Sequence, residues 1–510
     1  MKVKRLHLQN YGRFEDLKID FAPTAEKAGN ITVIVGDNGA GKSQILQALA
    51  TGLSWFVNGV LDSSGQPTTR TKADNEFLKL PHEGEYIRQS QIKNTKEEVS
   101  LKLSFLDVKE EVKSIKVSAT RKEVLSPAVY GIDDDGFNSL IEQYTNIFGD
   151  NREASLPLIA NYTTDRNVEV NSINAGYSYM LNQLSAYKDF LNAGVNYALF
   201  FQWFRDNEDI ENEQSKNKIS KSEKVDELIQ SQMRLHDLLL EREHFDDIEY
   251  FPNDEVRYLS LAELSAEIEK EKYHYNSLNI RNHWLNEAAL KNQLTSLNAI
   301  RNAIEYFTNF KNPRIRRQGT PTMIVEKDGE ELDVNQLSQG EKSLLALVGD
   351  IARRLAILNP SLDNPLEGEG MVMIDEVDLH LHPKWQHDLI DKFVKTFPNV
   401  QFVLTTHSPH VISDRPDTLV YALDDGELNQ VSNVYGEDVN TVLTKVFDVP
   451  IRDPKAQKDF DKVAELIYQK KFESAESYIM KLEKQMPENL ELLRCRLHLT
   501  QAQLAAKKEG

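Results

Sequence analysis

The sequence contains almost no cysteine and lacks any long apolar run. Cys495 is the only cysteine among 510 residues. It cannot form a disulfide within the chain, which fits a reducing compartment. No apolar run reaches the roughly 18 residues of a membrane span, and the chain begins with the strand-like MKVKRLHLQNY. We therefore expect neither a membrane span nor a secretory signal, and a cytoplasmic location.

The sequence also contains fewer basic than acidic residues. The chain has 60 Lys and Arg against 80 Asp and Glu, a net charge of −20. This balance excludes a protein that coats nucleic acid over its whole surface, but it leaves room for a local basic groove. The clearest basic cluster is Lys311, Arg314, Arg316 and Arg317. It is either the charged edge of a hairpin or a phosphate contact.

A phosphate-binding pattern occurs near the N-terminus. Residues 36–43 read GDNGAGKS and follow the apolar run ITVIV, which predicts a buried strand, a P-loop and a helix. Glycines let the backbone N–H groups approach a triphosphate, the lysine reaches the β- and γ-phosphates, and the serine hydroxyl ligates magnesium. We predict ATP contacts at Gly36, Asn38, Gly39, Gly41, Lys42 and Ser43, with Ser43 also a magnesium ligand.

A second apolar strand ends in two carboxylates. Residues 371–374 read MVMI and are followed by Asp375 and Glu376. A carboxylate at the end of a buried strand is costly unless it is paired or near a cation, so we assign Asp375 to the magnesium shell through water. Glu376 points the other way, and we predict that it is the general base that orients the attacking water.

Between these two motifs lies the sequence LSQGEKS, residues 337–343, followed by an apolar helix. Ser338 and Gly340 open that helix, whose N-terminal N–H groups form a second anion site. We include Glu341 of the same motif among the nucleotide-binding residues. The order P-loop, LSxGE signature and acidic strand end is that of an ABC-type ATPase. In such proteins the signature of one protomer closes on the γ-phosphate held by the other, which predicts an ATP-sandwiched homodimer.

His407 follows a β-branched strand in the sequence VLTTHSP. A histidine at a strand end is often structural, but in this order of motifs we predict that it contacts the γ-phosphate as a catalytic sensor. The sequence DLHLHP, residues 378–383, also carries two histidines. It is either a metal site or, as we favour, the loop after the acidic strand end that crosses the dimer interface.

The fold class that these patterns predict is α/β, an ABC-type P-loop ATPase head with a helical insertion and a C-terminal helical extension. We place the N-terminal lobe at 1–170, the insertion at 171–310, the C-terminal lobe at 311–450 and the extension at 451–510. The insertion has heptad-like apolar spacing in Val225, Leu228, Ile229, Met233, Leu235 and Leu239. The extension resembles about one and a half tetratricopeptide repeats, which either pack on the head or present a face to a partner. The residues that carry this pattern are Ala464, Tyr468, Phe472, Ala475, Tyr478, Ile479, Pro487 and Leu493.

Four segments of the sequence resemble the SMC/RecF/OLD-like ATPases, and within that group the PtuA-like ATPases of Septu and retron antiphage systems. The segments are LSQGEKSLLALVGDIARRLA, MVMIDEVDLHLHPKWQ, FPNVQFVLTTHSPHVIS and FQWFRDNEDIEN. This resemblance implies a slow or regulatory ATPase that forms homodimers or larger assemblies around ATP and Mg²⁺. It also implies an HNH-type nuclease subunit as partner and, in retrons, a reverse transcriptase with its DNA–RNA product.

The chain itself lacks a Toprim-like DxD segment after His407 and an HNH-like histidine cluster, so we expect no nuclease site in it. A RecF- or Rad50-like repair clamp that binds DNA directly is the alternative, and a transporter ATPase is a third. The sequence does not single out a magnesium-sensing glutamine among Gln89, Gln91 and others. Arg166, after the apolar run at 156–162, is a further candidate near the nucleotide.

Overall fold

The computed structural model describes residues 1–63, 85–120, 129–133, 135–151, 153–164, 183–192, 197–216, 230–235, 237–239, 263–272, 274, 287–319, 321–413, 415–431 and 434–509. The chain divides into two compact units, Met1–Gly436 and Glu437–Gly510. Each unit has its own apolar core and is described by itself. The bounds of the four segments expected from the sequence remain predictions.

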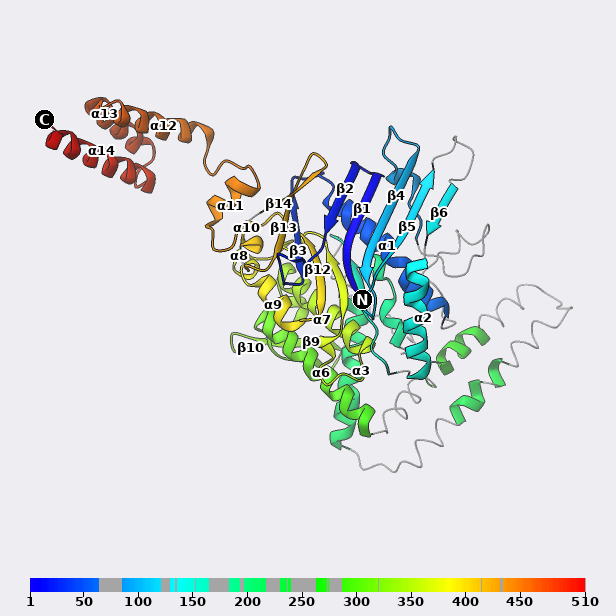
Figure 1. Cartoon of the computed structure of the whole chain (residues 1–510). Coiled ribbons are helices and arrows are strands. Elements are labelled where there is room, and N and C mark those ends of the chain that lie inside the picture. The colour runs from blue at the N-terminus through cyan, green and yellow to red at the C-terminus, as the bar shows by residue number, and fades with distance from the viewer. Residues whose placement is uncertain are drawn as a thin grey trace, which may run out of the picture. The chain divides into compact units, whose positions relative to one another are not determined.

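A five-stranded antiparallel sheet forms one layer of the first unit, with the strand order β2-β1-β4-β5-β6 (Figure 1). Apolar residues alternate with polar ones along these strands, so one face is buried and the other meets water. The strands of this sheet are β1 (Lys2–Tyr11), β2 (Phe14–Asp20), β4 (Glu98–Leu106), β5 (Val112–Thr120) and β6 (Val129–Asp133).

A second, six-stranded sheet has the order β14-β13-β3-β12-β11-β7. All neighbouring pairs are parallel except β13 with β14. Its central strands are continuous apolar runs because helices or the other sheet cover both faces. The strands are β3 (Ile31–Gly36), β7 (Leu158–Tyr162), β11 (Gly370–Ile374), β12 (Val400–Thr405), β13 (Leu419–Asp424) and β14 (Glu427–Val431).

Helix α1 (Lys42–Ser63) lies between the two sheets, since it contacts β4 and β5 of the first and β3, β7, β11 and β12 of the second. This position explains why the helix is buried on nearly every side. Gly52 allows the close approach to β4, because a Cβ there would lie 3.2 Å from the Leu101 side chain. Helix α2 (Asp135–Asp150) packs against α1 and β5.

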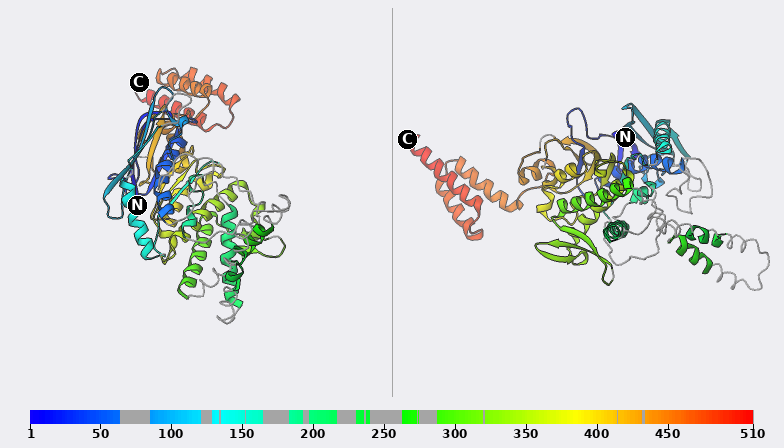
Figure 2. Two further views of the ribbon diagram at one scale, coloured as in Figure 1. Left: turned by 90° about the vertical axis from the view of Figure 1, so that its right-hand side faces the viewer. Right: turned by 90° about the horizontal axis from the view of Figure 1, so that it is seen from below.

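Helices cover the other side of the six-stranded sheet, and Figure 2 shows them on the far side of that sheet from the antiparallel one. Helices α3 (Tyr197–Lys216) and α6 (Glu287–Thr308) pack on α7 (Gln339–Leu358). Both belong to the insertion expected from the sequence, so its described parts support the head. The heptad positions Val225, Leu228 and Ile229, and Arg166, lie outside the described residues, whereas Met233 and Leu239 of the same pattern are 64% and 39% exposed.

Short elements complete the unit. They are η2 (Gln89–Gln91), η3 (Gln183–Tyr187), η4 (Phe190–Asn192), η5 (Val334–Gln336), η6 (Pro365–Glu367), α8 (Pro383–Gln386), α9 (Leu389–Thr396) and α10 (Pro409–Ile412). Within the described ranges, no helix combines the length and the apolar character that crossing a bilayer requires.

The basic cluster lies in a three-stranded sheet of β8 (Lys311–Arg316), β9 (Thr322–Lys327) and β10 (Glu330–Asp333). Each of its arginines pairs with carboxylates, which favours the hairpin-edge interpretation over a phosphate contact. Arg316 pairs with Asp333 at 3.1 Å. Arg317 reaches the buried Glu208 at 2.8 Å. The remaining pairs are Arg314 with Glu326 and with Glu331, and Arg317 with Asp209.

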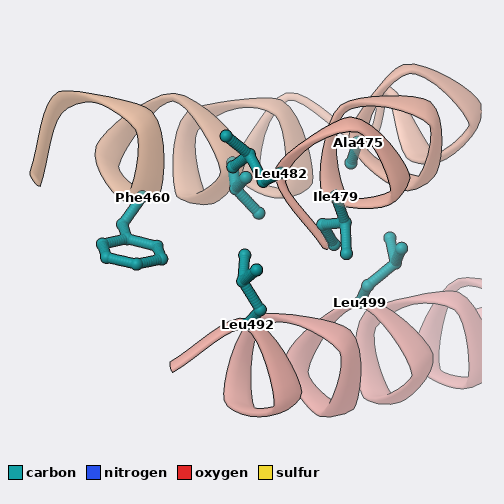
Figure 3. Close-up of a cluster of buried hydrophobic side chains, with 7 residues drawn as sticks. Phe460, Ala475, Ile479, Leu482, Leu492 and Leu499 are labelled. Carbon is teal, nitrogen blue, oxygen red and sulfur yellow. The ribbon is translucent and has the colours of Figure 1, made fainter. Parts of the chain in front are cut away.

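The second unit contains α11 (Val439–Val446), α12 (Pro454–Tyr468), α13 (Phe472–Gln485) and α14 (Leu490–Glu509). Helices α12, α13 and α14 share an apolar core, part of which Figure 3 shows. Ala475 and Ile479, which the repeat pattern singled out, lie in that core. Tyr468 and Leu493, from the same pattern, are 88% and 52% exposed instead. The core residues are Phe460, Val463, Ala475, Ile479, Leu482, Leu492 and Leu499.

Candidate nucleotide site

Three of the predicted motifs meet at one edge of the six-stranded sheet. Strands β3, β12 and β11 are adjacent and parallel, with Ile374 beside Leu404 and Leu404 beside Val33. Parallel strands end at the same edge, so the P-loop, the loop before His407 and the Asp375–Glu376 pair emerge side by side. This is the position at which open α/β sheets bind ligands.

The P-loop has the backbone that its glycines permit. Gly36, Gly39 and Gly41 have φ values of 154°, 79° and 113°, which side-chain-bearing residues rarely adopt. A Cβ at Gly36 would lie 2.2 Å from the Leu423 carbonyl oxygen, and one at Gly41 would lie 2.7 Å from the Phe14 ring. The loop therefore fits between its neighbours only with glycine at these positions, and it leads directly into α1.

The predicted phosphate-binding lysine is buried within this loop. The Lys42 ammonium group donates hydrogen bonds to the carbonyl oxygens of Gly36 at 2.7 Å and Asp37 at 3.0 Å. Burial lowers the pKa of Lys42 below its ordinary value, and attraction to nearby carboxylates, led by Asp375 and Glu376, offsets part of that shift. The predicted lysine and the predicted acidic pair thus share one electrostatic environment.

A single hydroxyl fixes both members of the acidic pair. Thr405 Oγ1 donates to Asp375 Oδ1 at 2.5 Å and accepts from the Glu376 N–H at 2.7 Å. Thr405 is fully buried at the end of β12, so the pair is held from the neighbouring strand. The Asp375 N–H donates to the Tyr162 carbonyl on the other side, at 2.8 Å. Asp375 is buried, whereas Glu376 is partly accessible.

Glu376 has an unusual backbone conformation for a glutamate. Its φ is +48°, in the left-handed region that favours glycine and asparagine. The hydrogen bond from its own N–H to Thr405 and the bond from the Val377 N–H to the Thr405 carbonyl hold it there. Strained residues held by their surroundings occur often at functional sites, and here the strain turns the chain sharply out of β11.

His407 lies in the loop after β12 and is anchored by Asp378. The His407 N–H donates to Asp378 Oδ1 at 3.4 Å, and the Thr406 hydroxyl donates to the same oxygen. The side-chain Nε2 of His407 is buried and has no hydrogen-bond partner among the described residues. A buried nitrogen without a partner is costly, so it is a candidate contact for a bound group.

The loop after the acidic pair is joined to the loop around His407. The Gln386 side chain donates to the Leu381 carbonyl and accepts from the Ser408 hydroxyl, both at 2.9 Å. His382 caps α8 by accepting from the Lys384 N–H at 3.2 Å. No group of three or more candidate metal ligands occurs in the described part of the chain. DLHLHP thus lies in a loop that is joined to the His407 loop, and its place at a dimer interface stays a prediction.

The signature helix begins with a complete capping box. Ser338 accepts from the Glu341 N–H, and the Glu341 carboxylate accepts from the Ser338 N–H at 2.8 Å and from its hydroxyl at 2.7 Å. Lys327 donates to the other carboxylate oxygen of Glu341 at 2.6 Å. Although burial opposes ionisation, these hydrogen bonds hold the pKa of Glu341 below its ordinary value. The anion is thus a fixed part of the helix start, which leaves the other N–H groups there for a ligand.

Gly340 brings the signature against the loop that follows the acidic pair. A Cβ at Gly340 would lie 2.1 Å from the carbonyl oxygen of His380. His380 itself has a φ of +64° and is exposed. The start of α7 is therefore in backbone contact with a loop that begins only a few residues after Glu376.

Farther along α7, a buried charge cluster connects the helix to β7. Asp350 is fully buried and pairs with Arg353 at 2.6 Å and Arg354 at 2.8 Å. The Tyr162 hydroxyl, at the end of β7, donates to Asp350 at 2.8 Å. Burial alone would raise the pKa of Asp350, but the two guanidinium groups hold it well below its ordinary range. The carbonyl of Tyr162 accepts from the Asp375 N–H, so Tyr162 links the cluster to the acidic pair.

A cavity of ≈ 310 Å³ opens beside the predicted magnesium ligands. Ser43 and Asp375 line one side, and Thr163 and Thr164, directly after β7, line another. Gln91, one of the unassigned glutamines, also lines it. A hydroxyl and a carboxylate beside a polar cavity are ligands that magnesium prefers, so the residues present fit that ion.

The structure adds residues that the motifs did not identify. Arg13, in the turn between β1 and β2, donates to the carbonyl oxygen of Gly39 in the P-loop. Gln44 accepts from the Arg13 N–H at 3.2 Å and so joins α1 to the same turn. Thr405 and Asp378 hold the acidic pair and the His407 loop. The threonine and aspartate adjoin recognised motifs, but Arg13 carries no signal apart from the tight turn at Tyr11–Gly12.

The six-stranded sheet carries the P-loop, the acidic pair and the histidine at one edge, and the signature helix begins with a capping box. These features define the class of protein as an ABC-type ATPase head. A family model for the AAA ATPase domain matches residues 1–412. This chain belongs to that family, and the α/β fold class expected from the sequence is confirmed.

Relatives among known proteins agree with this assignment. The retron Ec83 probable ATPase of Escherichia coli is 30% identical over 495 residues, which cover 94% of this chain and 82% of that protein. The retron Vc95 probable ATPase of Vibrio cholerae is 29% identical over 87% of this chain and 78% of that protein. The Septu protein PtuA of Bacillus mycoides is 37% identical over 76 residues, 15% of this chain and 10% of its own length. The resemblance to PtuA-like ATPases of defence systems is thereby confirmed.

Among solved structures, the Smc head domain of Pyrococcus furiosus, bound to the C-terminal domain of ScpA, matches with a TM-score of 0.40. The sequence identity is 16%, and the match covers 84% of this chain and 96% of that one. The strand order and the family match, rather than this likeness, carry the fold assignment.

Proposed function

We propose that this chain is the ATP-hydrolysing subunit of an antiphage defence complex and that it dimerises around ATP to control an associated HNH-type nuclease. The observation that carries the ATPase part is the convergence of the P-loop, Asp375–Glu376 and His407 at one sheet edge. The defence part is supported by the retron and Septu relatives, whose names place them in such systems.

In this proposal the P-loop amides and Lys42 bind the β- and γ-phosphates of ATP. Lys42 would exchange its carbonyl partners for phosphate oxygens. The buried ammonium group would then be paired with an anion, which offsets the cost of its burial. Ser43 and Asp375 would hold Mg²⁺, which supplies Lewis-acid stabilisation of the phosphate charge when it is bound. The Nε2 atom of His407 would gain the partner that it lacks by contacting the γ-phosphate.

Glu376 would orient the attacking water and accept its proton. Its left-handed backbone and the hydrogen bond to Thr405 fix the direction in which the side chain leaves the strand. A positioned base of this kind contributes about 10²- to 10⁴-fold to a rate. Glu341 and the N-terminal amides of α7 belong to the helix start that would close on the γ-phosphate bound by a second copy.

The placement of the signature supports the proposal of a second copy. Gly340 contacts the loop after the acidic pair, and the hydrogen bonds of Ser338 run to its own helix. The chain thus has two phosphate-binding helix starts, α1 and α7, while one triphosphate needs one from each partner. ATP binding would then act by stabilising the closed dimer, which suits a slow, regulatory ATPase.

The experiment that tests the ATPase part is mass photometry of the purified protein with ATP and Mg²⁺. The variant Glu376→Gln is expected to accumulate as an ATP-dependent dimer, whereas Lys42→Ala is expected to stay at its ATP-free mass. An ATP-free mass for Glu376→Gln at saturating ATP would contradict the sandwich.

The defence part is tested by affinity purification of the protein expressed from its native operon, with and without ATP. Recovery of an HNH-type nuclease in a defined ratio by native mass spectrometry is the expected result, with a reverse transcriptase and its DNA also present if the operon is a retron. Recovery of an ATP-dependent dimer that retains DNA, without a nuclease, would favour the RecF- or Rad50-like clamp. The pairing of the β8 arginines with carboxylates speaks against that clamp.

A further inference from the structure

Helix α14 carries apolar residues on two opposite faces. Leu492 and Leu499 are buried, and Figure 3 shows both pointing from α14 toward α12 and α13. These contacts account for one face of the helix. An ordinary surface helix would be polar on the opposite face, because only one stripe has a core to contact.

The opposite face of α14 is instead a row of exposed leucines. At 3.6 residues per turn, these leucines fall within an arc of about 60° and extend over about 20 Å, or four turns. A single exposed leucine needs no explanation, but a row of them marks an interaction surface. The exposed Thr500 interrupts the row between its third and fourth leucines. The four residues, here called the leucine stripe, are Leu490, Leu493, Leu497 and Leu504, with exposed fractions of 76%, 52%, 61% and 56%.

The spacing of the leucine stripe is that of a helix–helix seam. Its members follow each other at intervals of three, four and seven residues, as the a and d positions of a heptad do. A helix that lies on a membrane surface has a broader apolar face than such a narrow seam. The stripe therefore fits the side of another helix better than it fits a lipid surface.

The charges beside the stripe select the kind of helix. Arg494 borders the stripe on one side and is largely exposed, with a 3.3 Å contact to Glu491 of its own helix. Arg496 borders it on the other side and pairs with Glu483 of α13 at 2.6 Å. A second copy of this surface would bring further arginines, and no additional carboxylates, to the flanks of the stripe. Charge complementarity thus favours a partner whose flanking positions carry Asp and Glu.

We propose that the leucine stripe is the docking site for an acidic amphipathic helix of about four turns in a partner protein. This inference rests on the proposed function, because it identifies the surface through which the ATPase would hold its protein partner. It adds the chemistry of that partner: leucine-type residues at heptad spacing, flanked by carboxylates.

A synthetic helical peptide tests the surface on the full-length protein. The probe is a fluorescein-labelled peptide of three heptads with leucine at a and d and glutamate at e and g, measured by fluorescence anisotropy. We expect saturable binding that weakens at least tenfold in the double variant Leu493→Gln/Leu497→Gln. The matched control is Met480→Gln, which changes an exposed apolar residue of α13 and should bind as the unaltered protein does.

A charge swap tests the selectivity. The same peptide with lysine in place of glutamate should bind the unaltered protein at least tenfold more weakly, and the variant Arg494→Glu should narrow that difference. Equal binding of both peptides by all of these proteins would overturn the proposal. Loss of self-association in the glutamine double variant would also overturn the proposal, because it would assign the stripe to a second copy of the chain. Loss of binding to anionic phospholipid vesicles in that variant would overturn it as well, because it would assign the stripe to a membrane surface.

The thermal unfolding midpoint separates docking from folding. The glutamine double variant should unfold at the same temperature as the unaltered protein, because the stripe is exposed. A lower midpoint would mean that the chain itself covers the stripe, which overturns the proposal. Failure of peptide binding with ATP-dependent dimerisation intact would reject this inference alone, whereas loss of dimerisation with peptide binding intact would reject only the proposed function.

Discussion

Lys42 illustrates how one side chain can be held ready for a ligand. Its ammonium group is buried, yet it donates to backbone carbonyls within the P-loop. Carbonyl oxygens stabilise a buried cation less well than an anionic phosphate does, because charge-assisted hydrogen bonds are roughly twice as strong as neutral ones. The pKa of Lys42 is lowered because burial destabilises the charged form more than the nearby carboxylates stabilise it.

We predict that Lys42→Ala weakens ATP binding by about 100-fold or more, since removal of one partner of a buried charge pair costs about 2–5 kcal/mol. A fluorescent ATP analogue titrated against the purified protein provides the measurement. Lys384→Ala, an exposed lysine of α8, is the control. Unchanged affinity in Lys42→Ala would remove the lysine from the phosphate site.

Glu376 makes a second prediction at the residue scale. Glu376→Gln keeps the shape of the side chain but cannot accept a proton, so steady-state ATP turnover should fall by about 10²- to 10³-fold. The affinity for ATP should not fall, because the backbone bond to Thr405 is retained. Phosphate release and equilibrium binding measured on the same sample separate the two effects. Undiminished turnover would rule out Glu376 as the base.

At the scale of elements, the start of α7 and the loop after β11 act as one piece. Gly340 is the point of contact, and no side chain fits between its Cα and the His380 carbonyl. Gly340→Ala should therefore displace this loop or the helix start while leaving the P-loop intact. We expect ATP-dependent dimerisation to be lost and the ATP affinity of the single chain to be kept.

Mass photometry and nucleotide titration of Gly340→Ala give the two readings. Gln339→Ala is the matched control, since Gln339 is exposed in the same turn of the helix and should dimerise normally. If Gly340→Ala dimerises at the same ATP concentration as the unaltered protein, the contact with His380 is not needed for closure of the dimer.

The buried charge cluster gives another prediction at this scale. Asp350→Asn leaves Arg353 and Arg354 without their buried anion, and breaking such a pair costs about 3–5 kcal/mol. The thermal unfolding midpoint of the ATPase unit should fall accordingly. Asp363→Asn, in the exposed loop after α7, is a control that should leave the midpoint unchanged.

The pH dependence of this effect has a definite sign. The pKa of Asp350 is lower in the folded chain than in the unfolded one, so its contribution to stability is complete above the ordinary carboxyl pKa of about 3.9. The contribution is lost as the pH falls toward the folded value. The midpoint difference between Asp350→Asn and the unaltered protein should therefore be constant near neutral pH and shrink in acid.

At the scale of the whole molecule, the two units have separate cores. Leu482, in the core of α12, α13 and α14, is almost completely buried. Leu482→Ala should destabilise the C-terminal unit by about 2–5 kcal/mol and leave ATP binding by the first unit unchanged. Differential scanning calorimetry with and without ATP would show whether one transition moves alone. A joint shift of both transitions would indicate that the units unfold together.

Much of the site can be predicted from the sequence, because each of its motifs consists of residues that are close together in the chain. The P-loop glycines, the strand that ends in Asp375 and Glu376, and the capping box at Ser338 each occupy a few consecutive residues. Their backbone geometry depends on residue type at fixed spacing, which a single sequence displays. The strands around them are likewise continuous apolar runs, and β3, β11 and β12 lie where those runs predict.

The remaining features depend on neighbours that are distant in the sequence. Arg13 joins the P-loop across 26 residues, and Tyr162 joins Asp350 across 188. The basic cluster became a paired hairpin edge because Glu208 and Asp209, on α3, lie beside it. Ion pairing of this kind has no local pattern, so composition alone left two interpretations open.

The sequence by itself determined the order of the motifs, the α/β class and the residue types for phosphate chemistry, because glycine, lysine and carboxylate act through short-range geometry. Packing of the chain was needed to show that Thr405 holds both Asp375 and Glu376, that Gly340 contacts His380, and which leucines of α14 are buried. Burial and contact are properties of the packed chain: Leu492 and Leu493 are adjacent and chemically identical, yet one lies in a core and the other faces water.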